Sequence, residues 1–203
     1  MCATVAYSDD HGETWQLGRS PNEGRQTPEG ELDPQTFVDE TWSLHEAAVV
    51  ERRDGALLLF MRNQHPCGRV AVSESHDAGQ TWGPIRFDEE LPEIWCQPNA
   101  ISLPSTEGED RIVFANASLM LPFRGCGVIR LSLDGGRTWK YSRTLNPGHH
   151  VYQCMCVLPD GRIGILWENE CQGLYFSRLP LSWFSDVVET VDPRQAEEQA
   201  SLS

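Results

Sequence analysis

The sequence predicts an all-β chain that builds about three to four blades of a β-propeller, part of a ring that needs about 4–8 blades to close. Three observations lead to this prediction. An eight-residue pattern, Ser-x-Asp-x-Gly-x-Thr-Trp, occurs three times. Short apolar runs alternate with turns rich in Asp, Gly and Ser, which is typical of antiparallel strands. No stretch keeps the apolar spacing of a helix for more than a turn or two.

The three repeats are interpreted as turns that support successive blades. In each repeat the Asp can accept backbone N–H bonds inside a tight turn, and the Gly supplies a positive φ. The Trp is expected to bury its ring beneath the turn. A structural role is therefore favoured over a direct role in chemistry. The repeat residues are Ser8, Asp10, Gly12, Thr14 and Trp15, then Ser75, Asp77, Gly79, Thr81 and Trp82, then Ser132, Asp134, Gly136, Thr138 and Trp139.

Strands are expected before, between and after the repeats. The clearest case is residues 45–63, where two apolar runs meet at Asp54-Gly55, a dipeptide that favours a hairpin. Residues 17–40 and 85–93 are predicted to be connections. The other expected strands are 2–7, 70–75, 99–103, 111–116, 127–132, 152–158, 162–168 and 173–179.

The chain is predicted to form one partial propeller domain at residues 1–189. Residues 190–203 are strongly polar and are expected to form a disordered tail. A strand that begins at residue 2 indicates that the chain starts inside a domain. A partial propeller leaves strand edges unpaired, so poor solubility or self-association is expected.

Composition excludes some partners. The chain has 16 Lys and Arg against 30 Asp and Glu, a formal net charge of −14. This argues against nucleic acid or an anionic membrane as the main partner, but a few arginines can still bind an acidic ligand in one pocket. No apolar run approaches the roughly 20 residues of a membrane span. No leader signal occurs at the start, so a soluble chain of undefined compartment is expected.

The seven cysteines do not indicate a zinc site or a disulfide framework, because their number is odd and they form no Cys-x-x-Cys pair. Cys154 and Cys156 are expected on one face of a strand as small core residues. No metal and no cofactor are predicted. Five histidines without ligand spacing are expected at the surface or in turns, namely His11, His65, His76, His149 and His150.

The repeats resemble the Asp-box of exo-α-sialidases (neuraminidases), and the residues between them match that family in the same order. His45-Glu46, with 49–51 and 59–63 behind it, resembles the segment that carries a catalytic Glu and a substrate-binding Arg. Trp95-Cys96-Gln97 resembles a stretch that lines the sugar pocket. The resemblance extends to about residue 184. It implies a six-bladed propeller of sialidase type, whose N-terminal blades would come from the same domain.

The resemblance also implies a set of site residues. In the family, a Tyr is the nucleophile, a Glu takes its proton, arginines bind the substrate carboxylate, a Gln lines the pocket and an acid steadies an arginine. At the matching positions, the catalytic residues are Tyr152 and Glu46, and the substrate-binding residues are Arg62, Arg124, Gln97 and Glu168.

These residue types suit the chemistry of sialic acid, which carries a carboxylate on its anomeric carbon. Arginine pairs with a carboxylate through two parallel bonds, which fix its orientation. An anionic nucleophile would be repelled by that carboxylate, whereas a neutral phenol would not, and sialidases use a Tyr. A phenol with its ordinary pKa of about 10 is a weak nucleophile at neutral pH, so a nearby carboxylate is needed to take the proton.

The implied activity is retaining hydrolysis of terminal sialic acid from glycoconjugates, with a sialylated glycan or another acidic sugar as partner. However, no residue of this chain can be assigned to the first of the three family arginines or to the acid/base Asp. One alternative is a non-catalytic or inactive propeller that binds carbohydrate or protein. Another is a propeller enzyme acting on a different acidic sugar or ester, because arginines recognise any carboxylate.

Overall fold

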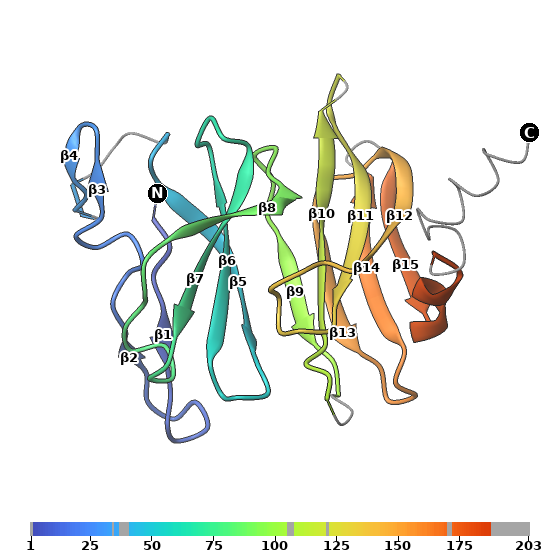
Figure 1. The fold of residues 1–203 in the computed structure, drawn as a ribbon, viewed down its shortest axis with the longest axis horizontal. Coiled ribbons are helices and arrows are strands. Elements are labelled where there is room, and N and C mark those ends of the chain that lie inside the picture. Colours follow the sequence, from blue (N-terminus) through green and yellow to red (C-terminus); the bar gives the residue numbers. More distant parts are fainter. Residues whose placement is uncertain are drawn as a thin grey trace, which may run out of the picture.

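The computed structural model describes residues 2–33, 35–36, 41–104, 108–120, 122–169 and 172–187. Three antiparallel sheets follow one another along the chain (Figure 1). The first, in the order β5-β6-β7-β8, contains Leu44–Glu51, Leu57–Asn63, Arg69–Ser75 and Arg86–Pro92. The second, with neighbours β9-β10-β11-β12, contains Asn99–Ser102, Ile112–Met120, Arg124–Ser132 and Tyr141–His149. The third contains β13 (Gln153–Val157), β14 (Ile163–Asn169) and β15 (Gly173–Leu179).

Smaller elements flank these sheets. Two short hairpins precede them, and a 3-10 helix, η1, follows them. The predicted tail at 190–203 lies outside the described residues. The hairpins pair β1 (Ala6–Tyr7) with β2 (Gln16–Leu17) and β3 (Gln26–Thr27) with β4 (Gly30–Glu31), and η1 is Leu181–Val187.

The first strands of the three sheets lie next to one another. β9 packs beside β5 on one side and β13 on the other, as in blades arranged around a common axis. Each sheet is a meander, because consecutive strands are neighbours. The all-β partial propeller predicted from the sequence is therefore confirmed.

Each repeat joins the third strand of a blade to the fourth. The second repeat joins β7 to β8, the third joins β11 to β12, and the first joins β1 to β2, which thus hold the equivalent place in another blade. Two of these strands differ from the sequence prediction: β8 lies in the expected connection at 85–93, and β12 follows the third repeat, where no strand was expected. Similarly, β3 and β4 interrupt the expected connection at 17–40.

The three repeats share one hydrogen-bond pattern. In the third, Asp134 Oδ1 accepts the Thr138 backbone N–H at 2.9 Å, and Asp134 Oδ2 accepts the Thr138 hydroxyl at 2.6 Å. The Ser132 hydroxyl donates to Asp134 at 2.8 Å and accepts the Gly136 N–H at 2.8 Å. The first and second repeats have the same bonds. Each repeat is thus a turn whose Ser, Asp and Thr side chains bond one another and the backbone N–H groups of the turn, as expected for the Asp.

The tryptophans of the repeats differ in burial. Trp139 is 5% exposed, but Trp15 is 66% exposed, so the expectation of a buried ring is wrong for the first repeat. Trp139 fits between the first two sheets, against Phe60 and Phe114. Trp15 instead folds over its own turn, where its indole N–H donates to the Gly12 carbonyl at 3.2 Å.

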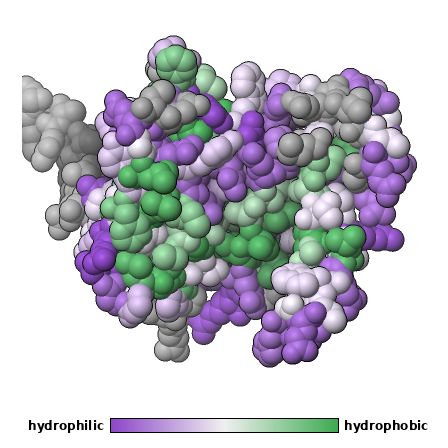
Figure 2. Space-filling model, turned by 180° about the vertical axis from the view of Figure 1, so that it is seen from behind, coloured by the Kyte–Doolittle hydropathy of each residue, from purple (hydrophilic) through white to green (hydrophobic). Residues whose placement is uncertain are grey.

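Two apolar cores join the sheets. Phe60 of β6 and Phe114 of β10 are fully buried at the boundary between the first and second sheets, with ring centroids 5.3 Å apart. Val113, Ile165 and their neighbours fill the boundary between the second and third sheets. The outer face of the third sheet is apolar but exposed, with Leu166 and Phe176 paired across β14 and β15. Figure 2 shows hydrophobic residues gathered on this side of the molecule.

Cys154 and Cys156 share one face of β13, as predicted, but that face is exposed, so their assignment to the core is wrong. Met155 lies between the two cysteines and packs into the core from the opposite face of the strand. Within the described part of the chain, no helix is long and apolar enough to span a membrane.

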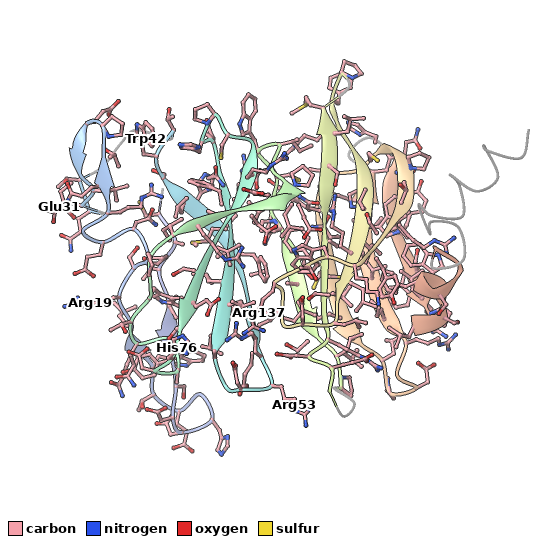
Figure 3. The ribbon with its side chains drawn as sticks, in the orientation of Figure 1. Arg19, Glu31, Trp42, Arg53, His76 and Arg137 are labelled. Carbon is pink, nitrogen blue, oxygen red and sulfur yellow. The ribbon has the colours of Figure 1, made fainter. Side chains whose placement is uncertain are left out.

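The repeats and the candidate site residues lie at opposite ends of the blades. β5 begins near Glu46, whereas β7 and β11 both run toward a repeat at their C-terminal ends. In Figure 3, His76 and Arg137 of the second and third repeats lie at the lower end of the ribbon, and Trp42 lies at the upper end. The repeats are therefore placed to stabilise blades and not to contact a ligand at the other end.

Replacing the repeat aspartate should destabilise the fold most where the repeat is best packed. We expect Asp134→Ala to lower the free energy of unfolding by roughly 2–4 kcal/mol, because it removes four charge-assisted or turn bonds. Asp10→Ala, in the exposed first repeat, should cost less. Urea unfolding of both variants measures the difference, and equal losses would contradict the packing argument.

The repeats also predict an acid dependence of stability. Hydrogen bonds from Thr81, then from Ser75, hold the pKa of Asp77 at about 2, below its ordinary value. A carboxyl whose pKa is lowered by folding stabilises the fold above its unfolded pKa, and this contribution disappears as the pH falls toward the folded value. The unfolding midpoint of the parent chain should therefore fall between pH 4 and pH 2. The midpoint of Asp77→Asn should depend less on pH in this range, because the titrating carboxyl is gone.

Candidate active site

Glu46 reaches the site through a β-bulge. His45 pairs with Arg62 and Ala47 pairs with Met61, which leaves Glu46 as the extra residue of β5. Its φ of 39° lies in the left-handed region, which is uncommon for a residue other than Gly. The extra residue of a bulge bends the strand locally and changes the direction of one side chain. Glu46 Oε2 thereby accepts a hydrogen bond from Arg62 Nη1 at 2.5 Å.

Arg62 is the centre of the site. Its Nη1 also donates to the phenolic oxygen of Tyr152 at 3.4 Å, so Glu46 and Tyr152 meet at one guanidinium nitrogen. The Arg62 side chain is 17% exposed and that of Glu46 is 31% exposed. Burial lowers the pKa of Arg62, but the hydrogen bond and charge of Glu46 outweigh it, so the net shift is upward. The arginine is therefore a permanent cation.

Tyr152 is held by the third sheet. Its carbonyl accepts the Glu168 N–H at 3.0 Å, and the Val151 N–H donates to the Glu168 carbonyl at 3.3 Å, which extends the β13–β14 ladder toward the site. The guanidinium carbon of Arg124 lies 5.4 Å from the centre of the Tyr152 ring, a cation–π distance. Tyr152 thus contacts one arginine through its hydroxyl and another through its ring.

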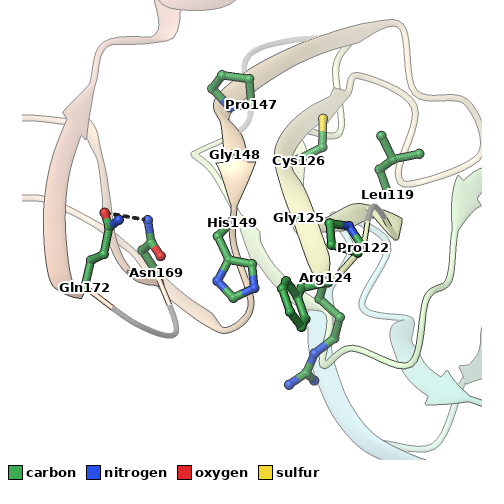
Figure 4. Close-up of a pocket in the computed structure, with 11 residues that line it drawn as sticks. Leu119, Pro122, Arg124, Gly125, Cys126, Pro147, Gly148, His149, Asn169 and Gln172 are labelled. Carbon is green, nitrogen blue, oxygen red and sulfur yellow. Dashed lines mark hydrogen bonds between the residues drawn. The ribbon is translucent and has the colours of Figure 1, made fainter.

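Arg124 begins β11, where that strand faces β12. Its Nη1 donates to the Trp95 carbonyl at 3.3 Å. Arg124 also lines a pocket of about 430 Å³ between the ends of the second and third sheets (Figure 4). In that view Arg124 and His149 reach the pocket from β11 and β12. His149, Asn169 and Gln172 add polar groups to a lining that is otherwise largely apolar, and of the four clustered residues this pocket is lined by Arg124.

The structure brings four of the predicted site residues together and leaves two apart. Glu46, Arg62, Arg124 and Tyr152 form one cluster. Gln97 and Glu168 contact the strand that carries Tyr152 through backbone groups, and their side chains are not part of the cluster. Gln97 contributes its carbonyl, which accepts Gln153 Nε2 at 3.0 Å, and the Glu168 side chain has no ion pair within the part of the chain that the structure describes.

His150 is 1% exposed, so its expected place at the surface is wrong. It packs over Gly127, where an added Cβ would lie 2.4 Å from the ring, and its Nε2 hydrogen-bonds with Gln153 Oε1 at 2.9 Å. Burial lowers its pKa, although the Gln153 bond opposes this. His150 is therefore a neutral support for the strand that carries Tyr152. No group of three His, Cys, Asp or Glu among the described residues could hold a metal ion.

Sequence reasoning missed Glu93, a carboxyl that is 5% exposed behind the cluster. It directly precedes the stretch Ile94-Trp95-Cys96-Gln97. The available signal was an acid next to three apolar residues that were candidates for burial. An acid is almost never fully buried without a partner, so such a position indicates a specific role.

The fold and its repeated turns define a β-propeller with Asp-boxes. The sequence profile of the BNR repeat-like domain matches residues 1–165. A sialidase of Micromonospora viridifaciens is 29% identical over 189 residues, which cover 91% of this chain and 26% of that protein. A sialidase of Bacteroides fragilis is 28% identical over 225 residues, which cover 87% of this chain and 41% of that protein.

A solved structure of a leech intramolecular trans-sialidase, in complex with 2,7-anhydro-Neu5Ac, has a similar fold. Its TM-score is 0.69 at 23% identity, covering 90% of this chain and 28% of that chain. The chain thus spans less than half the length of each of these proteins. It belongs to the BNR repeat-like domain family, and its Micromonospora and Bacteroides relatives are sialidases.

Proposed function

We propose that this chain is the C-terminal part of the catalytic domain of an exo-α-sialidase, a glycoside hydrolase that releases terminal sialic acid with retention of configuration. The observation that carries the proposal is the meeting of the Glu46 carboxylate and the Tyr152 hydroxyl at Arg62 Nη1. Sialidase relatives support the same class of reaction. The substrate would be a sialylated glycan, bound through its carboxylate by Arg62 and Arg124.

Each residue of the cluster has a role in this reaction. Tyr152 Oη attacks the anomeric carbon as Glu46 takes its proton, and the bond from that carbon to the aglycone oxygen breaks. The departing oxygen needs a proton from an acid, for which no residue of this chain is assigned. The group that protonated the aglycone then takes a proton from water, whose oxygen attacks the same carbon and breaks its bond to Tyr152, while Glu46 returns its proton to the phenol. Two inversions give net retention.

Arg62 would act twice in this scheme. Its guanidinium stabilises negative charge that develops on the tyrosine oxygen, because Nη1 already points at it. The Arg62 side chain is 17% exposed, so the accessible part of its guanidinium, and not the buried Nε, would pair with a substrate carboxylate.

The proposal is tested with the full reading frame that contains these 203 residues. Hydrolysis of a fluorogenic sialoside should release sialic acid, and proton NMR during the first turnovers should detect the α-anomer before mutarotation. No released sialic acid, or the β-anomer as first product, would contradict the proposal.

A second candidate is a propeller that binds an acidic sugar without cleaving it. Arg62 and Arg124 beside Tyr152 would bind a carboxylate whether or not a bond is then cleaved, which supports this candidate. A glycan array combined with a sialic acid release assay separates the two candidates. Binding to sialylated glycans without release would support the second.

A further inference from the structure

Glu93 lies between β8 and β9, and its carboxyl is folded back over its own turn. Glu93 Oε1 accepts the Cys96 N–H at 2.8 Å, and the N–H groups of Ile94 and Trp95 also favour its charged form. The Glu93 N–H donates to the Gly68 carbonyl at 2.9 Å. The acid therefore fixes the shape of residues 93–96 from inside the protein.

That turn contacts the site at two points. The Trp95 carbonyl accepts Arg124 Nη1, and the Cys96 thiol donates to the Val151 carbonyl at 2.9 Å, one residue before Tyr152. Trp95 has a φ of 64°, a strained conformation for a bulky residue that persists only where its surroundings enforce it. The Glu93 carboxyl supplies that enforcement, since it bonds the residue that follows Trp95.

Glu93 also lies near Arg62, without an ion pair between the two side chains. The charge of Arg62 acts on Glu93, and Glu93 Oε2 and Arg62 Nε are both buried without a hydrogen-bond partner among the residues that the structure describes. The acid thus interacts with Arg62 through charge, and reaches Arg124 and the strand of Tyr152 through the turn that it bonds.

We propose that Glu93 is a positioning residue of this site, which sets the spacing of Arg62, Arg124 and Tyr152 and couples the binding of a carboxylate ligand to uptake of one proton. This inference rests on the proposed function only in that the ligand is an acidic sugar. It holds for a binding protein as well as for an enzyme.

The coupling follows from charge. Burial raises the pKa of Glu93 to about 7, although the surrounding N–H groups and Arg62 oppose this. A ligand carboxylate on the two arginines brings a further negative charge close to Glu93, which favours its protonated form. Binding should therefore take up a proton, and affinity should fall as the pH rises above about 7.

Other groups that face Glu93 do not titrate in this range. Burial raises the pKa of the Cys96 thiol to about 11, and the pKa of Arg62 lies above its ordinary value. Arg124, which acts on Cys96, remains a cation. His149, the imidazole that lines the pocket beside Arg124, is the other group that could take up a proton, and the Glu93→Gln variant distinguishes it from Glu93.

The test is calorimetric titration of the full reading frame with sialic acid, in two buffers of different ionisation enthalpy, from pH 6 to pH 8.5. The parent protein should take up a proton on binding, and its Kd should rise by up to about tenfold per pH unit above pH 7. Glu93→Gln keeps an oxygen for the Cys96 N–H, so it should fold and bind, but with no proton uptake and a flat Kd. Glu89→Gln, on the exposed side of β8, is the matched control and should behave as the parent.

Glu93→Ala tests the positioning role separately. It should weaken binding at every pH, and Glu93→Gln should restore most of the affinity. Proton uptake that persists in Glu93→Gln would overturn the coupling, and parental affinity in Glu93→Ala would overturn the positioning role. If the parent binds with proton uptake but releases no sialic acid, the proposed enzymatic function fails and the role of Glu93 stands.

Discussion

Tyr152→Phe is expected to abolish the hydrolysis of a sialoside by the full reading frame, with a loss of at least about 10³-fold in kcat. The substitution removes only the phenolic oxygen. The ring that lies under Arg124 remains, so binding of the substrate carboxylate should change little. The predicted signature is a large fall in kcat with a KM close to that of the parent. Initial rates over a range of substrate concentrations measure both.

Tyr141→Phe is the matched control for this substitution. Tyr141 begins β12, at the opposite end of that strand from His149 and the pocket. The Tyr141→Phe variant should retain the kcat and KM of the parent protein. Mass spectrometry of protein quenched during turnover adds a direct test, since a sialyl adduct on the parent should be missing from Tyr152→Phe. A Tyr152→Phe protein with parental turnover would exclude tyrosine as the nucleophile.

Phe60→Ala is expected to cost about 3–5 kcal/mol of folding free energy, a larger loss than we expect for a repeat aspartate. Phe60 is 0% exposed and packs against Phe114 and Trp139, which belong to the next blade. Removing its ring leaves a cavity at the boundary between two sheets, where neither sheet can collapse without losing its own register. Urea unfolding followed by tryptophan fluorescence measures the loss.

Phe176→Ala is the control, because Phe176 is 53% exposed on β15. Its removal should change the free energy of unfolding by about 0.5 kcal/mol or less. It should also reduce the self-association expected from the exposed apolar face, which sedimentation velocity can detect. Equal destabilisation by the two substitutions would contradict the assignment of the inter-blade core.

The sequence was sufficient for the features that depend on local chemistry. The Ser, Asp and Thr side chains of the Ser-x-Asp-x-Gly-x-Thr-Trp turns bond within the turn, so their pattern alone identifies them. The β5–β6 hairpin was equally clear, since apolar runs flank Asp54-Gly55. β8 and β12 were missed because both are edge strands with polar, acidic or Pro-containing sequences, and an edge strand needs no continuous apolar run.

The candidate site was harder to predict from the residues themselves. The order of Glu46, Arg62 and Tyr152 along the chain matched a known family, but their meeting depends on the bulge at Glu46. A bulge is a property of strand register, which one sequence does not reveal. Glu93 was overlooked because its burial arises from a turn that folds its carboxyl back onto the Cys96 N–H, near Arg62 from another part of the chain.

The separation of the repeats from the site has a practical consequence for handling the protein. The Asp-box turns project from the end of the blades opposite Glu46 and Tyr152, and His76 and Arg137 lie there. His76 has a side chain that is 73% exposed. A cysteine introduced at this position, with the exposed Cys67, Cys154 and Cys156 replaced by serine, would allow a fluorophore or a solid support to be attached on the side remote from the candidate site. The protein could then be immobilised with the end that carries the candidate site directed to solvent, as a sensor surface requires.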